Sequence, residues 1–184
     1  MRPLFITAHY DDLEICAGGT AARFGGTSVV LTPKEDKGTE EEAARAAAIL
    51  RLEIILPRSG RQGVADLSLI IDSYDTIIAS SPWDSHPDHR NAANVARQVA
   101  RKNNVNLWFM DHAIPGGYNY GPRPNHFVDT GKKPYIRTQK FDAIDCYTVI
   151  TAEDRRAIYN RDAYYGITHG TSYAEGFVAE HTIT

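Results

Sequence analysis

Two short segments of the chain carry side chains that can bind a metal ion, and each follows an apolar run. The first is residues 8–14, A-H-Y-D-D-L-E, after the apolar residues 4–6. The second is residues 85–89, S-H-P-D-H, after the run at 76–80. Imidazole and carboxylate groups at the ends of two strands of one sheet can converge on one ion although they are far apart in the sequence. We therefore interpret the chain as a mononuclear metal hydrolase.

His9, Asp12 and His89 are the candidate metal ligands. Catalytic zinc sites use three protein ligands from His, Asp and Glu, and they keep a further position for water, whose pKa falls to about 7. Such a water needs a base that is not itself a ligand, and Asp11 is the natural candidate. His86 precedes His89 by three residues, so at a helix start both rings can face the same side. His86 could then polarise a substrate carbonyl or protonate a leaving amine.

Short apolar runs alternate with amphipathic segments along the chain, which is typical of βαβ units on a largely parallel sheet. This pattern predicts an α/β sandwich with the metal-binding segments at the carboxyl edge of the sheet. A long loop is expected over 111–135, where Gly, Pro, Asn and Tyr replace the regular pattern. The predicted strands are 4–8, 27–32, 53–56, 75–80, 105–110 and 142–150, and the predicted helices are 15–24, 39–51, 67–73, 87–101 and 152–165.

Composition limits the alternatives. The 184 residues are 42% hydrophobic, which fits a single domain spanning 1–184 with an ample core. The formal net charge of −3 gives no long-range attraction for nucleic acid or anionic membranes. We find no apolar run that could span a bilayer and no secretory signal pattern, so we expect a cytoplasmic protein. Cys16 and Cys146 form neither a close-spaced metal pair nor a disulfide framework.

The sequence also resembles a known family. Residues 8–23, A-H-Y-D-D-L-E-I-C-A-G-G-T-A-A-R, are similar to the first motif of the LmbE-like (PIG-L) deacetylase family, A-H-P-D-D-E followed by G-G-T. The H-P-D-H of residues 86–89 is similar to the second motif, and weaker similarity extends to residues 173–177. The resemblance implies a Rossmann-like three-layer sandwich with a mainly parallel sheet. It also implies zinc-dependent removal of N-acetyl groups from glucosamine-containing glycoconjugates.

The resemblance assigns roles to individual residues. It implies that His9, Asp12 and His89 bind one Zn²⁺ per chain, with Fe²⁺ or Co²⁺ as alternatives. It implies that Asp11 is the general base. The remaining two catalytic residues would be His86, as a transition-state stabiliser, and Asp88, which would lie behind it.

The chain departs from the family pattern at several positions. Tyr10 stands where the family usually has proline, and Leu13 where it usually has glutamate. Gly38 occupies the place of an arginine that commonly helps to hold the sugar, three residues before Glu41. The chemistry is therefore better defined than the substrate. Two other functions stay open: hydrolysis of a non-sugar N-acyl amide, and a non-catalytic binding protein that retains the fold.

Substrate recognition is expected near the long loop, because residues after the strand at 105–110 emerge at the active-site edge. Hydrogen-bond donors and flat aromatic faces suit a sugar ring, so we expect a small amino-sugar or glycoconjugate as partner. The alternatives are a loop that only covers the sheet edge or that makes contacts in a homo-oligomer. The candidate substrate-binding residues are Tyr10, Trp83, His112, Tyr118, Tyr120 and Arg123.

Two of the interpretations have structural alternatives. Trp83 lies three residues before His86, which favours the pocket wall, but it could equally belong to the core. Asp88 or Ser85 could serve only to cap the helix that begins at Pro87. Asp11 and Asp12 could likewise cap the helix after them, although capping would not explain the neighbouring histidines.

Overall fold

A seven-stranded sheet forms the centre of the protein, as seen in a computed structural model that describes residues 1–34, 36–56, 67–68, 70–112 and 121–181. The strand order is β3-β2-β1-β4-β5-β7-β6. The five strands from β3 to β5 run parallel, whereas β7 is antiparallel to both β5 and β6. The strands are β1 (Pro3–Thr7), β2 (Thr27–Val30), β3 (Glu53–Ile55), β4 (Thr76–Ala79), β5 (Asn106–Met110), β6 (His126–Asp129) and β7 (Ala174–His181).

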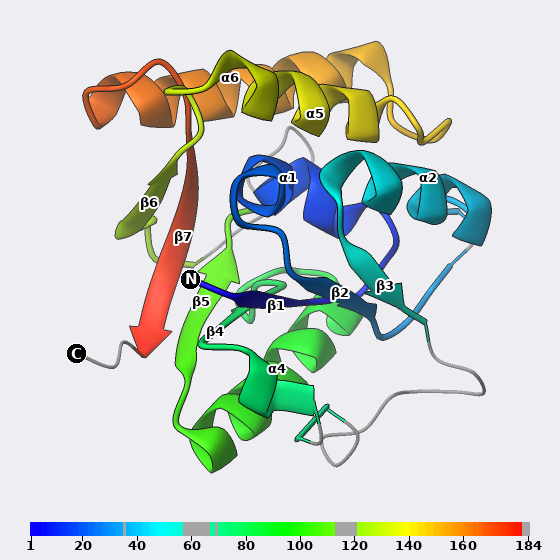
Figure 1. The fold of residues 1–184 in the computed structure, drawn as a ribbon, viewed down its shortest axis with the longest axis vertical. Helices are drawn as coiled ribbons and strands as arrows, with labels where there is room; N and C mark the ends of the chain where they lie inside the picture. The colour runs from blue at the N-terminus through cyan, green and yellow to red at the C-terminus, as the bar shows by residue number, and fades with distance from the viewer. Residues whose placement is uncertain (35, 57–66, 69, 113–120, 182–184) are drawn as a thin grey trace.

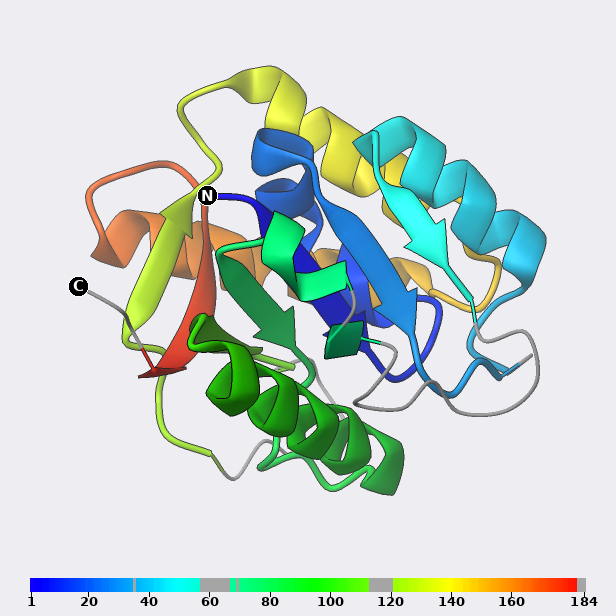
Figure 2. The ribbon, with the colours of Figure 1, turned by 60° about the horizontal axis from the view of Figure 1, so that its bottom comes forward.

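Helices cover both faces of this sheet, which makes a three-layer α/β sandwich (Figures 1 and 2). The helix α4 and the 3₁₀ helix η1 lie on one face, and the other helices lie on the opposite face, where α5 packs against α1 and α2. In the described ranges, no helix combines the length and apolar character needed to cross a membrane. The helices are α1 (Asp12–Phe24), α2 (Glu40–Leu50), η1 (Ile71–Ser73), α4 (Pro87–Asn103), α5 (Pro134–Ile144) and α6 (Ala152–Thr168).

Strand residues alternate between two hydrophobic cores, one on each face of the sheet. Phe5 and Ile78 point into the core beneath α1, α2 and α5. Leu4 and Ile77 point into the opposite core, which is closed by the alanine-rich side of α4. This alternation follows the two-residue period of a strand, and it holds β1 and β4 rigidly from both sides.

The two segments that carry the candidate metal ligands become neighbours because β1 and β4 pair directly. Ile6 lies opposite Ala79 in the parallel register, and the backbone N–H of Ser80 donates to the carbonyl of Ile6 at 3.1 Å. Both chains therefore leave the sheet at the same edge. The strand order reverses at this point, since β1 connects onward to β2 on one side and lies beside β4 on the other. Ligand sites of open α/β sheets form at such a crevice.

The structure corrects the sequence-based elements after Met110. Residues 142–150 were predicted as a strand, but α5 runs to Ile144 and turns follow it. Ala143 and Ile144 are buried at helical spacing with Ile136 and Lys140, so the apolar residues at the start of the predicted strand belong to the buried face of α5. The loop predicted for 111–135 contains β6 and the start of α5, and β7 was not predicted as a strand.

A buried ionic cluster ties α5 and α6 to α1 and β7. Lys140 Nζ lies 2.6 Å from Asp162 Oδ2 and 2.7 Å from Glu175 Oε1, and all three side chains are almost fully buried. Glu175 also accepts hydrogen bonds from the backbone N–H groups of Gly19, at 2.8 Å, and Thr20, at 2.6 Å. A Cβ at Gly19 would lie 2.7 Å from Thr130 Cγ2. The G-G-T sequence of α1 therefore permits close packing and supplies donors to Glu175.

Candidate metal centre

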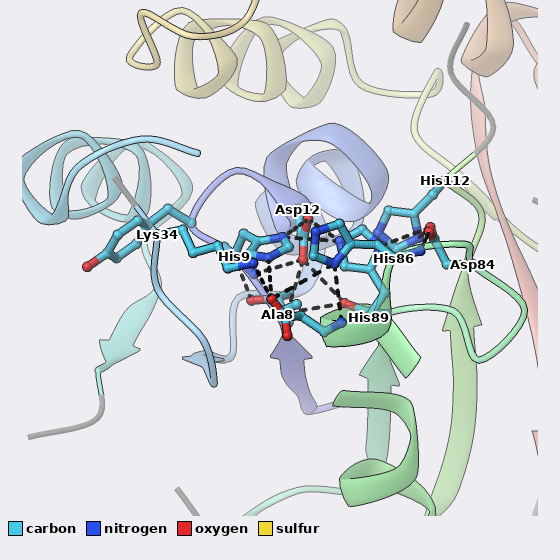
Figure 3. Close-up of polar contacts among 12 residues, drawn as sticks. Ala8, His9, Asp12, Lys34, Asp84, His86, His89 and His112 are labelled. Carbon is cyan, nitrogen blue, oxygen red and sulfur yellow. Dashed lines mark hydrogen bonds and ion pairs between the residues drawn. The ribbon is translucent and has the colours of Figure 1, made fainter. Parts of the chain in front are cut away.

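Three side-chain atoms form a compact triangle at the carboxyl ends of β1 and β4 (Figure 3). His89 Nε2 lies 3.2 Å from His9 Nδ1 and 3.2 Å from Asp12 Oδ1. The third side, from His9 Nδ1 to Asp12 Oδ1, measures 3.7 Å. The structure thus brings the three predicted ligands together.

The triangle has the dimensions of a face of a metal coordination sphere. A tetrahedral zinc ion with bonds of about 2.0–2.2 Å separates neighbouring ligand atoms by about 3.3–3.6 Å. The observed separations of 3.2 to 3.7 Å fall close to that range. Two imidazoles and one carboxylate also match the ligand types of catalytic zinc sites. The residues present therefore fit a divalent ion.

The two oxygens of Asp12 have separate tasks. Oδ2 accepts hydrogen bonds from the backbone N–H groups of Ala8 and His9, both at 3.0 Å, and lies 3.4 Å from the hydroxyl of Ser80. Oδ1 is left facing His9 and His89. Asp12 therefore does not cap α1, and Asp11 makes no side-chain capping bond either. The alternative that Asp11 and Asp12 serve only as caps of the following helix is therefore wrong.

His89 and Asp12 carry opposite charges in the metal-free site. Burial disfavours ionisation of both groups, but their mutual attraction prevails. Asp12 and Asp84 raise the pKa of His89 to about 10, and His89 holds the pKa of Asp12 well below its usual value. A metal ion at this place would displace the imidazole proton, because only the neutral ring binds metals.

Asp84 orients the His89 ring. Its Oδ2 lies 2.8 Å from His89 Nδ1, while its Oδ1 accepts the backbone N–H of His86 at 2.7 Å. A carboxylate beside Nδ1 favours the tautomer that carries its proton there, which leaves the Nε2 lone pair for a metal. Sequence analysis missed Asp84. Its position two residues before His86, in the same strand-end segment, was the available signal.

The side chain of His86 caps the N-terminus of α4. The sequence had suggested Ser85 or Asp88 for this role. His86 Nδ1 accepts the backbone N–H of Asp88 at 3.2 Å. The neutral ring must then carry its proton on Nε2. Burial, together with the nearby rings of His9 and His89, lowers the pKa of His86 and favours this neutral form. The His86 and His89 ring centroids are 5.1 Å apart, so both rings face the same site as predicted from their spacing.

Asp88 connects three groups around the site. Its Oδ2 lies 2.6 Å from Lys34 Nζ, 3.4 Å from His9 Nε2 and 3.9 Å from His86 Nδ1. The hydrogen bond from Lys34 is the main cause of the lowered pKa of Asp88. Lys34 follows β2 and was also missed, because a single lysine after a strand carries no specific pattern. Its side chain is 39% exposed, so it places a positive charge at the rim of the site.

Two further buried carboxyls adjoin the ligands. Burial, reinforced by the charge of Asp12, raises the pKa of Asp11 to about 7. Burial and the nearby Asp11 raise the pKa of Glu14 to about 8, and Glu14 Oε2 has no hydrogen-bond partner among the described residues. Asp11 therefore exchanges protons near neutral pH, as a general base requires.

The predicted substrate-binding residues have different surroundings. Tyr10 follows β1, and its carbonyl accepts the hydroxyl of Tyr147 at 2.7 Å. Trp83 packs edge-to-face on Phe109 with ring centroids 5.7 Å apart, which favours the core alternative. His112 is buried beside His89.

The other three predictions lie further along the chain. Tyr118 and Tyr120 are outside the described residues. Arg123 is exposed and lines a cavity of about 480 Å³ together with Phe127 and Tyr165. This cavity does not include the metal ligands.

The fold and site together define a class of α/β protein with a crevice at the carboxyl edge of the sheet, where His and Asp side chains could hold a metal ion. No protein-family model matches the chain. Solved structures do match it over nearly its full length. A conserved protein from Thermus thermophilus has a TM-score of 0.78 at 24% identity, and the match covers 100% of this chain and 96% of that one.

Two deacetylases share the fold as well. N,N'-diacetylchitobiose deacetylase from Pyrococcus horikoshii aligns with a TM-score of 0.73 and 20% identity, covering 97% of this chain and 83% of that chain. The zinc-inhibited form of teicoplanin deacetylase aligns with a TM-score of 0.72 and 16% identity, covering 100% of both chains. At these identities the similarity establishes the fold.

Proposed function

We propose that the protein is a metal-dependent N-deacetylase. The triangle of His9 Nδ1, Asp12 Oδ1 and His89 Nε2 carries this proposal, because its dimensions and ligand types suit a catalytic zinc ion. The deacetylases among the structural neighbours support the same class of reaction. In this proposal residues 1–184 form one catalytic domain of the LmbE-like type, working on a small molecule in the cytoplasm.

A divalent ion at His9, Asp12 and His89 would supply Lewis acidity to a water molecule and to the acyl oxygen. Asp11 takes the proton from the attacking water, for which its pKa of about 7 is suited. His86 holds its Nε2 proton available to the acyl oxygen as negative charge develops there. The amide C–N bond then breaks, and the amine leaves with the proton that Asp11 accepted. The products are a carboxylate and a free amine.

Asp88 is a positioning residue in this scheme. It lies close to both His9 and His86, and its backbone N–H fixes the tautomer of His86. Lys34 keeps Asp88 ionised. The backbone N–H of Asp88 places the proton of neutral His86 on Nε2, while burial and the charges of His9, His89 and Lys34 lower the pKa of His86 against the opposing charge of Asp88.

We propose an N-acetylated amino sugar, free or in a conjugate, as the substrate. Hydrolysis of a non-sugar N-acyl amide is the second candidate, and one observation favours it. Gly38 stands where the resembling family has a sugar-holding arginine, and its φ is 111°. A Cβ there would lie 2.7 Å from Tyr147 Cδ1, so this backbone leaves no room for an arginine side chain.

Metal analysis combined with acetate release tests the proposal. Protein purified without chelator should contain about one divalent ion per chain, since one triangle of ligands is present. It should release acetate from N-acetylglucosamine derivatives, or from other N-acyl amides under the second candidate. His89→Ala and Asp12→Ala should lose both metal and activity, and His169→Ala, at the exposed end of α6, should lose neither. A wild-type protein without metal or without deacylation of any panel member contradicts the proposal.

A further inference from the structure

A cavity of about 510 Å³ opens between α5 and α6. Figure 1 shows both helices at the top of the molecule, above α1 and α2. The helices pack mainly on different elements, α5 on α1 and α2 and α6 on β7, which leaves space between them. The volume lies within the range of small-molecule sites. The residues that line the cavity are Arg137, Thr138, Phe141 and Asp142 of α5, and Ala152, Arg155, Arg156 and Tyr159 of α6.

Three guanidinium groups line this cavity. Arg137 lies on α5, and Arg155 and Arg156 lie on the facing side of α6. Asp142 is the only acidic residue among the described residues that line the cavity. This excess of positive charge in the lining contrasts with the formal net charge of −3 of the whole chain. Guanidinium groups bind phosphates and carboxylates through paired hydrogen bonds, so an anion is the expected ligand.

Two acidic residues beside the cavity contact the arginines of α6, but to different extents. Arg155 is held firmly, because its Nη2 donates to Asp145 Oδ2 at 2.7 Å and its Nε lies 2.7 Å from Asp145 Oδ1. Arg156 Nη2 lies 4.0 Å from Glu153 Oε1, and these two side chains are 71% and 77% exposed. Such an exposed pair contributes little stability, so Arg156 can turn to an incoming anion at small cost.

Aromatic rings adjoin the guanidinium groups. The guanidinium carbon of Arg137 lies 4.5 Å from the ring centroid of Tyr173, a cation–π contact that orients the group. The hydroxyl of Tyr173 donates to the hydroxyl of Tyr159. The rings of Tyr159 and Phe141 lie next to each other, with centroids 5.9 Å apart. The cavity therefore combines cationic groups with a wall of aromatic rings.

We propose that this cavity binds a small phosphate ester that carries a flat ring. The phosphate group lies between Arg137 and Arg156, and the ring lies against Tyr159 and Phe141. A phosphate presents three acceptor oxygens, so guanidinium groups from two helices can bind it at once. The site does not include the candidate metal ligands, and it does not depend on the proposed function.

Titration calorimetry of the protein with adenosine monophosphate tests this site. Adenosine, which lacks the charge, and inorganic phosphate, which lacks the ring, are the control ligands. Arg137→Gln and Arg156→Gln each remove one cation and keep a polar side chain. Arg101→Gln is the matched control, because Arg101 is an exposed arginine near the end of α4, on the other face of the sheet. His89→Ala shows whether the ligand binds at the metal centre instead.

Wild-type protein should bind adenosine monophosphate more tightly than either control ligand. Arg137→Gln and Arg156→Gln should each lose about tenfold or more in affinity, as expected for a charge-assisted hydrogen bond. Asp142→Asn should bind more tightly than the wild type, because it removes a negative charge from the cavity wall, and misfolding would not produce this gain. Arg101→Gln and His89→Ala should match the wild type.

Three results overturn the proposal. The first is a wild-type protein that binds no adenosine monophosphate. The second is wild-type affinity in folded Arg137→Gln and Arg156→Gln, with thermal unfolding as the check of folding. The third is an equal loss of affinity in Arg101→Gln or His89→Ala, which would place the ligand on the general surface or at the metal centre.

Discussion

At the scale of single residues, each histidine of the centre is set by what its second ring nitrogen contacts. His89 Nδ1 lies 2.8 Å from Asp84, and His9 Nε2 lies 3.4 Å from Asp88. His86 Nδ1 accepts a backbone N–H. In the proposed function, these contacts would determine which ring nitrogen faces the metal or the substrate, so they would define the chemistry as much as the proposed ligands do.

Asp11→Asn should separate catalysis from metal binding. Asp11 is not part of the ligand triangle, so the variant should keep its metal while kcat falls by about 10²-fold or more. Steady-state kinetics and elemental analysis on the same preparation measure both quantities. Wild-type activity at normal metal loading would exclude Asp11 as the base.

The pH profile should report the same residue. Asp11 acts as a base only when deprotonated, and its pKa in the metal-free site is raised to about 7. A bound cation lowers the pKa of a neighbouring carboxyl. The kcat/KM of the metal-loaded enzyme should therefore fall on acidification, with its acid limb at or below about pH 7. An acid limb that persists unchanged in Asp11→Asn would assign it to another group.

Asp84→Asn should weaken metal binding without removing a ligand. The carboxylate makes the Nε2 of His89 a better donor, and loss of such a partner typically costs about 10–100-fold in metal affinity or activity. Chelator competition measures the affinity. Asp72→Asn, on the exposed side of η1, is the control. An unchanged affinity would reduce Asp84 to an organiser of the loop before α4.

At the scale of elements, the G-G-T turn of α1 and the strand β7 are joined through one buried lysine. Lys140 contacts both Asp162 and Glu175, and its side chain is 2% exposed. Gly18 leaves room for this lysine, since a Cβ there would lie 3.0 Å from Lys140 Cγ. Packing and hydrogen bonding to Glu175 thus explain the residues Gly18, Gly19 and Thr20 of this motif.

Lys140→Met should destabilise the protein strongly. The substitution removes the cation that contacts the buried carboxylate of Glu175, whereas Asp162 keeps its contact with Arg161. Loss of one partner of a buried ion pair typically costs about 3–5 kcal/mol. Urea unfolding of metal-free protein measures the change. Lys132→Met is the matched control, because that lysine is 81% exposed and should change stability by about 0.5 kcal/mol or less. A loss no greater than that of the control would mean that the cluster contributes no net stability.

Helices, strands and site residues could be predicted from the sequence only where a local pattern of residue types marks them. The convergence of His9, Asp12 and His89 could be predicted because residue type, order and placement after β1 and β4 all agree. The end of α5 and the turns after it were mistaken for a strand over 142–150 because the buried face of the helix continues into apolar turn residues. The strand β7 was overlooked because its partners, β5 and β6, are defined only by tertiary pairing. Asp84 and Lys34 likewise gain their roles from contacts that spacing does not reveal.

At the scale of the whole molecule, the metal-free protein carries two buried carboxyls that prefer their protonated form. The pKa values of Asp11 and Glu14 are raised to about 7 and about 8, above the ordinary values that apply to the unfolded chain. Between the ordinary and the raised pKa values, the folded state binds more protons than the unfolded state. Its free energy of unfolding must therefore decrease as the pH rises.

Metal-free protein should accordingly be more stable at about pH 6 than at about pH 8. Glu14→Gln should flatten this dependence, because the amide stays neutral throughout. Chemical unfolding at both pH values, with Glu40→Gln at the exposed start of α2 as control, measures the difference. Added zinc should raise the stability at both pH values by mass action. Equal slopes for Glu14→Gln and the wild type would place the titration elsewhere.

The position of β7 between β5 and β6 has a consequence for how the protein is made. During synthesis β5 and β6 leave the ribosome before residues 174–181, so neither can pair with β7 until that strand has been translated. Until then the nascent sheet has an unpaired β5 edge, which is open to association with other chains. Glu175 arrives with the same strand, so the charge of Lys140 is balanced fully only at that stage. The first motif, translated early, thus depends on the late strand for its final packing, and biogenesis is most exposed to misassembly in this interval.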